Sequence, residues 1–445
     1  MKYRARIDKV IQSLSKESVL ILNSSVVLYR NSYISYPYRN NSDFLYLTGL
    51  NLPEAKLALD YSGKILLFMK FPDLKIEQWS GKMITPDEVA DSLGIPLKNI
   101  HQAEKFDSMI SKILNNRREL FWDFGVHEQL DREIIRIANS LNRNGRSSDF
   151  GPTRFISSHE LIGEMRVLKD FDEMNMIRKA IAITADAMKE TIRFSRSARV
   201  IYEYQIKAKF ESILLDHGVL SPSYPTIVGG GNNATYLHYE KCDQLVSPGS
   251  LVLIDGGAEW MGYAADITRV FPVAKKFAPA QKEIYNIVLT AQKRAIETAN
   301  SSSATLEKIH NETVRSIVEQ LWELKLFHSV PDPKNSKKMI KPSSVNEVIE
   351  KKIYRIYYMH YTSHYLGLDV HDAGKYNFNS QPKILEKGMT FTVEPGLYFS
   401  RDLDFIPEKY KGLGIRIEDD ILFNGEFVEN LSIEIPKEIE ELERY

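Results

Sequence analysis

The sequence has very little cysteine, no excess of charge of either sign and no long apolar run. Cys242 is the only cysteine among 445 residues, which excludes an intrachain disulfide and a zinc site built on several thiolates. The 58 basic and 59 acidic side chains leave a net charge of −1. Without a basic excess to hold a phosphate backbone, nucleic acid is not expected as a ligand.

Membrane association is not expected either. The most apolar stretch, residues 19–29, is interrupted by Asn23, Ser24 and Ser25, and it is shorter than the ~18 apolar residues that a membrane-spanning helix needs. The N-terminal sequence MKYRARIDKV lacks the apolar core of a signal peptide. Together with the single cysteine, these features predict a globular protein of a reducing compartment, the cytoplasm.

The polar segment 143–153, which contains Gly145, Gly151 and Pro152, predicts a boundary between two domains. Before it, apolar runs typical of strands occur at residues 18–28, 56–60 and 64–68. Helical patches alternate with these runs, for example at Thr85 and Pro86, which are typical of an N-cap and a first helical position. The alternation predicts an α/β domain over residues 1–152.

After the boundary, helical spacing surrounds a strand-rich middle, which predicts an α+β domain over residues 153–445. The predicted helices cover residues 169–194, 201–217, 279–299 and 306–326. A polar segment rich in proline and lysine, residues 329–344, is expected to form a loop.

Two aspartates lie near the ends of neighbouring predicted strands. The apolar run 251–254 predicts a buried strand that ends in Asp255, and a second strand over about 262–271 carries Asp266. If Glu259 pairs with Gly262 around a two-residue turn, the two aspartates oppose each other, ~4.5–5.5 Å apart at Cβ. Two buried like charges at that distance are tolerable if a cation lies between them or if one carboxyl holds a proton. Two ordinary turn aspartates are the alternative.

Histidines are concentrated in one segment. His360, His364 and His371 fall within twelve residues of an apolar and aromatic stretch, although the whole chain has only ten histidines. Neutral imidazole is a common ligand of transition metals. A single buried histidine is more often structural, but three in one segment favour a functional cluster.

Two further stretches end in carboxylates. Glu394 follows the strand-like run 390–393, and Arg416 and Glu418 share one face of a predicted strand; a plain ion pair is the alternative for Arg416 and Glu418. The carboxylates and histidines together suit hard or borderline divalent ions such as Mn²⁺. Four carboxylates carry more charge than one divalent ion balances, which favours two metals that activate a water molecule.

These motifs resemble those of the pita-bread metallopeptidases, the family of aminopeptidase P, prolidase and methionine aminopeptidase. The resemblance covers nearly the whole chain and implies a pita-bread catalytic domain over residues 153–445. It also implies two divalent metal ions, with Mn²⁺ expected. The implied ligands are Asp255, Asp266, His364, Glu394 and Glu418.

The resemblance also implies individual roles. Asp266 and Glu418 would bridge the two ions, Asp255 would complete one, and His364 with Glu394 would complete the other. Glu394 would also shuttle the proton of the attacking water. The remaining implied site residues would contact the substrate (His238, in TYLHY), hold its carbonyl and the developing oxyanion (His360, His371), or orient the metal-binding carboxylates (Tyr398, Arg416).

The N-terminal region indicates which subfamily the sequence resembles. Residues 38–50, YRNNSDFLYLTGL, resemble the N-terminal domain that aminopeptidase P and prolidase share. Residues 76–82, IEQWSGK, resemble an aminopeptidase P stretch whose tryptophan reaches the active site of a neighbouring subunit. Trp79 is the matching tryptophan, so the resemblance implies the same position for it. Ordinary core packing is the alternative for Trp79. The family suggests a homodimer or tetramer. This sequence departs from the family's pattern in two places. One is the stretch GGGNNATY before His238, and the other is the segment 329–344, which resembles an insertion.

The resemblance therefore implies an Xaa-Pro aminopeptidase that hydrolyses the N-terminal Xaa–Pro bond of peptides with proline at the second position. The first alternative is an Xaa-Pro dipeptidase (prolidase), which would cleave only dipeptides. The second is a non-catalytic pita-bread binding module, but such relatives have lost ligands, whereas all five are present here.

Overall fold

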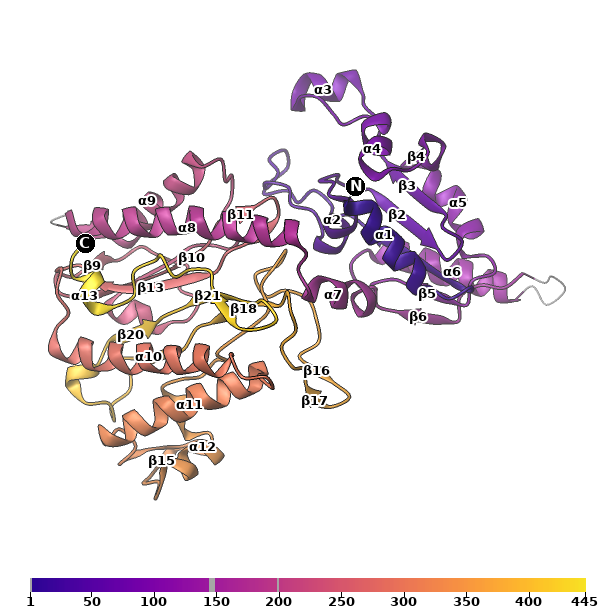
Figure 1. Cartoon of the computed structure of the whole chain (residues 1–445). Helices are drawn as coiled ribbons and strands as arrows, with labels where there is room; N and C mark the ends of the chain where they lie inside the picture. The colour runs from indigo at the N-terminus through magenta and orange to yellow at the C-terminus, as the bar shows by residue number, and fades with distance from the viewer. Residues whose placement is uncertain (1, 144–148, 198–199) are drawn as a thin grey trace. The chain divides into compact units, whose positions relative to one another are not determined.

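The computed structural model describes residues 2–143, 149–197 and 200–445 (Figure 1). The chain forms two compact units, Met1–Arg166 and Val167–Tyr445, and it passes from one to the other at the end of α7 (His159–Val167). The predicted boundary segment includes residues 144–148, which lie outside the described residues, so the division after residue 152 stays a prediction. In the described part of the chain, no helix is both long and apolar enough to cross a membrane.

The described residues of the first unit form one mixed six-stranded sheet. From edge to edge its strands are β4 (Ile100–Gln102), β3 (Ile65–Met69), β2 (Lys56–Asp60), β1 (Ser18–Asn23), β5 (Glu119–Phe121) and β6 (Arg154–Ile156). Two predicted strands correspond to β2 and β3. The strand predicted over residues 18–28 ends at Asn23, because the next two residues bond to the loop before β2. The Ser24 Oγ atom accepts a hydrogen bond from Ala55 N at 2.7 Å, and the Ser25 carbonyl oxygen accepts one from Glu54 N at 3.1 Å.

Helices complete this unit, which confirms the predicted α/β class. They are α1 (Lys2–Ser13), α2 (Ser42–Thr48), α3 (Leu74–Ser80), α4 (Pro86–Leu93), α5 (Lys105–Leu114) and α6 (Glu128–Arg143), with a 3₁₀ turn at Leu97–Asn99. Alternate strand residues such as Val19 and Ile21 form one buried cluster with Phe106 of α5 and Ile134 of α6. The predicted start of α4 is confirmed, since Thr85 forms a capping box.

Helix α3 buries none of its side chains. Trp79, on this helix, is 92% exposed. Core packing, the alternative considered for Trp79, is therefore wrong.

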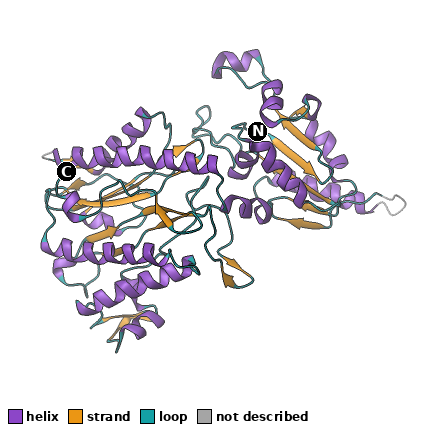
Figure 2. Ribbon diagram, viewed as in Figure 1, coloured by secondary structure: helices purple, strands orange, loops and turns teal. Residues whose placement is uncertain are grey.

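The second unit places helices on both sides of its strands (Figure 2), which confirms the predicted α+β class. Helix α8 packs against α9 and against strands β11 to β13, whereas α10 packs against α11 and against strands β18 to β20. The helices are α8 (Phe171–Ser197), α9 (Glu203–Asp216), α10 (Pro279–Thr298), α11 (Leu306–Glu323), α12 (Val345–Glu350) and α13 (Ile439–Leu442), with 3₁₀ turns η2 (Gly231–Thr235), η3 (Ile353–Ile356) and η4 (Glu408–Tyr410).

The strands of this unit form small sheets that meet around the central strands. The larger groups are β13 (Ile267–Pro272), β10 (Leu251–Gly256) and β8 (Ile227–Gly230); β18 (Thr390–Val393), β21 (Asp419–Phe423) and β22 (Val428–Asn430); and β19 (Gly396–Phe399) with β20 (Leu413–Arg416). The small pairs are β7 (Ile201–Tyr202) with β9 (Leu245–Val246), β11 (Glu259–Trp260) with β12 (Tyr263–Ala264), β14 (Val330–Asp332) with β15 (Asn335–Ile340), and β16 (Asn377–Phe378) with β17 (Gln381–Pro382).

The register of the central hairpin differs from the predicted one. Trp260 pairs with Tyr263 around Met261 and Gly262, so Asp255 lies opposite Thr268 and not opposite Asp266. Asp266 is two residues from Thr268 and therefore on the same face, diagonal to Asp255. It also lies between β12 and β13 rather than inside one continuous strand. Met261 and Gly262 adopt positive φ angles of 52° and 87°, which moves the tight turn one residue away from the predicted pairing.

The segment 329–344 was expected to be a loop, but most of it folds into the β14–β15 hairpin. Pro331 pairs with Met339 and Val330 with Ile340, and Val330 is fully buried. Of the apolar residues near the ends of the hairpin, Val330 is buried, whereas Ile340 is partly exposed.

Candidate metal centre

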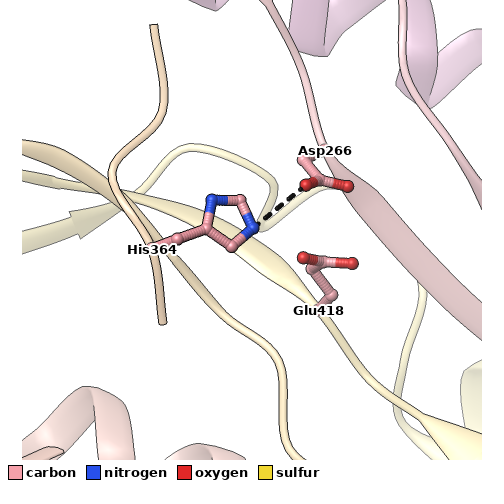
Figure 3. A group of neighbouring side chains, drawn as sticks. All are labelled: Asp266, His364 and Glu418. Atoms are coloured by element: carbon pink, nitrogen blue, oxygen red, sulfur yellow. Dashed lines mark ion pairs between the residues drawn. The ribbon is translucent and has the colours of Figure 1, made fainter. Parts of the chain in front are cut away.

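Three of the five predicted ligands meet at the centre of the second unit. Asp266, His364 and Glu418 each offer one ligand atom within 4.8 Å of the others, and all three are buried. Figure 3 shows their polar ends pointing toward one another from three separate segments. The His364 Nε2 atom lies 3.4 Å from the Asp266 carboxylate.

A backbone carbonyl orients His364, and a threonine hydroxyl holds Glu418. The Nδ1 atom of His364 lies 3.0 Å from its neighbour Tyr365's carbonyl oxygen, which directs Nε2 toward the carboxylates. Glu418 lies in the link between β20 and β21, where Thr268 Oγ1 donates to its Oε2 at 2.6 Å. The predicted strand through Glu418 is thus interrupted, and its carboxylate faces Thr268 of the central hairpin.

Asp255 joins this group through two neighbours. The Tyr224 hydroxyl lies 2.6 Å from Asp255 Oδ1 and 2.5 Å from Asp266 Oδ1, so it connects the two diagonal aspartates. Arg416 forms a buried ion pair with Asp255. The ion-pair partner of Arg416 is therefore Asp255 and not Glu418, which was the alternative considered above.

Glu394 lies directly after β18, as predicted, and contacts two histidines. Its carboxylate is 3.4 Å from His364 Nε2 and 3.6 Å from His360 Nδ1. The His360 Nε2 atom lies 2.9 Å from the Tyr398 hydroxyl, which accepts from Arg416 Nη1 at 3.1 Å. These predicted residues thus form one continuous network.

The two remaining predicted residues lie around this network. The ring of His371 stacks on that of His364, with centroids 3.9 Å apart. His238 lies in the exposed turn after η2. Burial is the main cause of the lowered pKa values of His360 and His371, and the charge of the nearby His238 makes a small further contribution.

Burial and mutual repulsion dominate the electrostatics of the site. Burial, with repulsion from neighbouring carboxylates, raises the pKa of Glu418 far above its usual range, and burial raises that of Glu394 to about 7. Burial disfavours the charged form of His364, but Asp266 and Glu394 outweigh it and raise the pKa of His364 to about 9. The buried carboxylates of this centre therefore stabilise a positive charge placed between them.

Comparison with known proteins decides the family. The sequence model of metallopeptidase family M24 matches residues 175–424, and that of the aminopeptidase P N-terminal domain matches residues 3–122. The chain is also 34% identical to the Xaa-Pro aminopeptidase of Escherichia coli K12, over 99% of this chain and 96% of that protein. The chain belongs to metallopeptidase family M24.

Solved structures agree with this M24 assignment over the whole length. Aminopeptidase PepP of Pseudomonas aeruginosa superimposes with a TM-score of 0.90 at 31% identity, covering 99% of this chain and 96% of that one. Zinc-substituted Escherichia coli aminopeptidase P in complex with product superimposes with a TM-score of 0.89 at 34% identity, and the match covers 100% of this chain and 97% of that one. The predicted pita-bread metallopeptidase with an aminopeptidase P-type N-terminal domain is thereby confirmed.

The donor set of this M24 peptidase fits divalent metal ions. Carboxylate oxygens and one imidazole nitrogen converge, and thiolate is absent from the described cluster. The buried Oδ1 atom of Asp420 also has no hydrogen-bond partner in the described part of the chain, while its Oδ2 accepts from Asp266 N at 3.1 Å. Such a density of buried carboxylate favours cations.

Sequence reasoning missed three residues of this M24 site: Tyr224, Thr268 and Asp420. Asp420 follows Glu418 so closely that the repeated acids of GIRIEDD were an available signal. Tyr224 is 31 residues from Asp255 and lies in a Pro- and Ser-rich stretch, which carries no comparable signal.

Proposed function

We propose that this chain is an Xaa-Pro aminopeptidase, which hydrolyses the N-terminal Xaa–Pro bond of a peptide and releases the first residue. The full-length match to Xaa-Pro aminopeptidases, N-terminal domain included, carries this proposal. The prolidase alternative has less support, because the relatives that match over the full length are named Xaa-Pro aminopeptidases.

The five predicted ligands, Asp255, Asp266, His364, Glu394 and Glu418, are proposed to hold two divalent ions, with Mn²⁺ as the expected metal. The oxygen-rich donor set supports this choice. When bound, the ions supply an activated water molecule and polarise the substrate carbonyl. Asp266 and Glu418, whose ligand atoms lie within 4.8 Å of each other, are proposed as the bridging pair.

Glu394 is proposed to move the proton. Burial raises the pKa of its carboxyl to about 7 when no cation is bound, and bound divalent ions would keep it ionised and able to accept a proton. Its contacts with His360 and His364 hold its carboxylate in one orientation. It would accept a proton from the attacking water and pass it to the leaving proline nitrogen.

The histidines are proposed to position the substrate. Burial lowers the pKa of His360 to about 3, so its ring is neutral at pH 7. A neutral imidazole can donate one hydrogen bond to a carbonyl or a developing oxyanion without carrying a charge. His371 is proposed to share this role, His238 to contact the substrate, and Tyr398 and Arg416 to orient Asp255 and His360.

The chemistry of the bond fits such a site. An Xaa–Pro bond is a tertiary amide without an N–H group and with a fixed φ angle. Recognition must therefore rely on ring shape and on groups around the carbonyl, which the aromatic residues near His360 can provide.

Two finer proposals concern assembly and location. We propose a homodimer or tetramer in which Trp79 reaches a neighbouring subunit's active site; its 92% exposure and the lack of buried side chains on α3 support this. We propose a cytoplasmic location on the basis of the single cysteine.

A chain-length comparison tests the activity. With Mn²⁺ added, Ala-Pro-Gly-Gly and Ala-Pro should both be offered at equal concentration, and release of alanine measured. We expect the tetrapeptide to be cleaved, and Ala-Gly-Gly-Gly to serve as the uncleaved control. Cleavage of the dipeptide alone would establish the prolidase alternative instead.

A further inference from the structure

One surface of the second unit carries a marked positive charge. Between residues 325 and 355 the chain has eight basic and only three acidic side chains, an excess of five, although the whole chain has a net charge of −1. The basic side chains are all exposed: Lys325, Lys334, Lys337, Lys338, Lys341, Lys351, Lys352 and Arg355. We call this set the basic face.

The basic face is built on consecutive elements. Three of its lysines lie on the β14–β15 hairpin, and others flank α12, which packs against α11 and is followed by η3. Within the described part of the chain, Lys351 is the only one in an ion pair, with Glu347 at 2.7 Å. Some exposed lysines elsewhere in this unit do have acidic partners, such as Lys293 with Glu438 at 2.7 Å. Unpaired like charges repel, and an anionic partner would relieve that repulsion.

The basic face borders the segment that carries His360. Arg355 lies on η3, and the chain continues from η3 through Tyr358 to His360. Thr362 joins this segment to α11, because its hydroxyl lies 2.9 Å from His310 Nδ1 and 2.7 Å from the Tyr358 hydroxyl. After burial, the charges of Arg355 and Lys352 contribute to lowering the pKa of His310 to about 4, so their field reaches this segment.

Apolar side chains are also exposed along this border. Tyr361 is 67% exposed and packs against His310, with ring centroids 5.0 Å apart, and Met359 is 40% exposed. Along the chain, these exposed apolar side chains lie between Arg355 of the basic face and His364 of the metal centre.

We propose that the basic face binds acidic side chains of a peptide whose N-terminus occupies the metal centre, so that acidic peptides are the preferred substrate class. This proposal rests on the proposed function and adds a specificity to it. A peptide is favoured over nucleic acid because the excess is confined to one stretch: the rest of the chain has a net charge of −6 and would repel a long phosphate backbone.

The expected size of the effect is modest. Single exposed ion pairs contribute little, but three or four formed together should tighten binding by roughly tenfold at low salt. Since the Debye length falls to about 3 Å at 1 M salt, this preference should largely disappear at high ionic strength.

Fluorescence anisotropy with non-hydrolysable probes tests the proposal. Two labelled twelve-residue peptides begin with Ala-Pro joined by a reduced bond, and differ only in four glutamates or four serines after the third residue. We expect the holoenzyme to bind the glutamate peptide roughly tenfold more tightly at 50 mM salt and about equally at 500 mM. Equal affinity at low salt would overturn the proposal.

Matched variants locate the effect. The triple variant Lys334→Glu, Lys337→Glu, Lys338→Glu should lose the preference, whereas Lys98→Glu, Lys105→Glu, Lys112→Glu, which alters exposed lysines of the first unit, should keep it. A preference lost equally in both variants would contradict a local site.

Further outcomes are also decisive. A single-stranded oligonucleotide or an anionic vesicle that binds the hairpin lysines more tightly than the glutamate peptide would overturn the peptide assignment. Because these probes are not hydrolysed, binding is measured whether or not the enzyme turns over Ala-Pro peptides. Failure of the proposed function, seen as lack of turnover, is thus separate from failure of this proposal.

Discussion

The ring of His371 stacks on that of His364, with centroids 3.9 Å apart and planes 21° apart. The residue after His371, Asp372, forms a buried ion pair with Lys169, whose Nζ lies 2.9 Å from Asp372 Oδ2. Gly367 allows this approach, since a Cβ there would lie 2.2 Å from the same oxygen. A buried charge pair between distant segments therefore fixes the loop that brings the two imidazoles together.

Replacement of Lys169 tests that relationship. Lys169→Met should destabilise the protein by roughly 3–5 kcal/mol, because it removes a buried cation that faces the Asp372 carboxylate. The double variant Lys169→Met, Asp372→Leu should recover part of that loss. Urea unfolding of the three proteins measures it, and a single variant within about 1 kcal/mol of the parent would contradict the importance of the pair.

Asp266→Ala should abolish metal binding and activity together, because Asp266 lies between His364 and Tyr224 at the middle of the carboxylate group. Equilibrium dialysis against Mn²⁺ and an Ala-Pro-Gly-Gly assay measure the two effects. Asp243→Ala, which changes a carboxylate outside the centre, is the control. Full Mn²⁺ stoichiometry with normal turnover in Asp266→Ala would disprove the site.

Tyr224→Phe should weaken metal affinity by roughly 10- to 100-fold while leaving turnover at saturating Mn²⁺ much closer to normal. The hydroxyl helps to orient Asp255 and Asp266, and its removal takes one hydrogen bond from each carboxylate. Activity measured over a Mn²⁺ titration separates the two effects. Tyr33→Phe, at a 91% exposed position, is the control. An unchanged titration midpoint would show that the hydroxyl does not position the ligands.

The first unit contains a pair that should make stability depend on pH. Burial disfavours the Asp43 carboxylate, but His159 and Arg166 outweigh burial and lower the pKa of Asp43. The hydrogen bond to Asp43 raises the pKa of His159 above 6.5. A raised histidine pKa contributes stability that is fully present below pH 6.5 and is lost as pH rises through the folded value.

His159→Ala should therefore destabilise the protein more at pH 5.5 than at pH 9. His159 is 60% exposed, so solvent screening limits the difference to less than about 1 kcal/mol. Urea unfolding at both pH values measures it, with His328→Ala, an exposed histidine of the second unit, as control. An equal loss at both pH values would show that the His159 charge does not act on Asp43.

Local patterns predicted much of the fold and site. Apolar runs identified β2, β3 and β10, and helical spacing identified α8, α10 and α11 within a few residues of their ends. The motif residues Asp266, His364 and Glu418 do converge. The expected loop at 329–344 failed because a polar composition does not exclude a hairpin whose ends are apolar.

By itself, the sequence determined the kinds of donor, their order along the chain and the two fold classes, because these depend on side-chain chemistry and on local periodicity. Only the tertiary structure decided which donors face one another. The diagonal placement of Asp255 and Asp266 depends on hairpin register, and the Lys169–Asp372 pair joins residues 203 positions apart. Such contacts arise from the packing of distant segments, which short-range pattern does not encode.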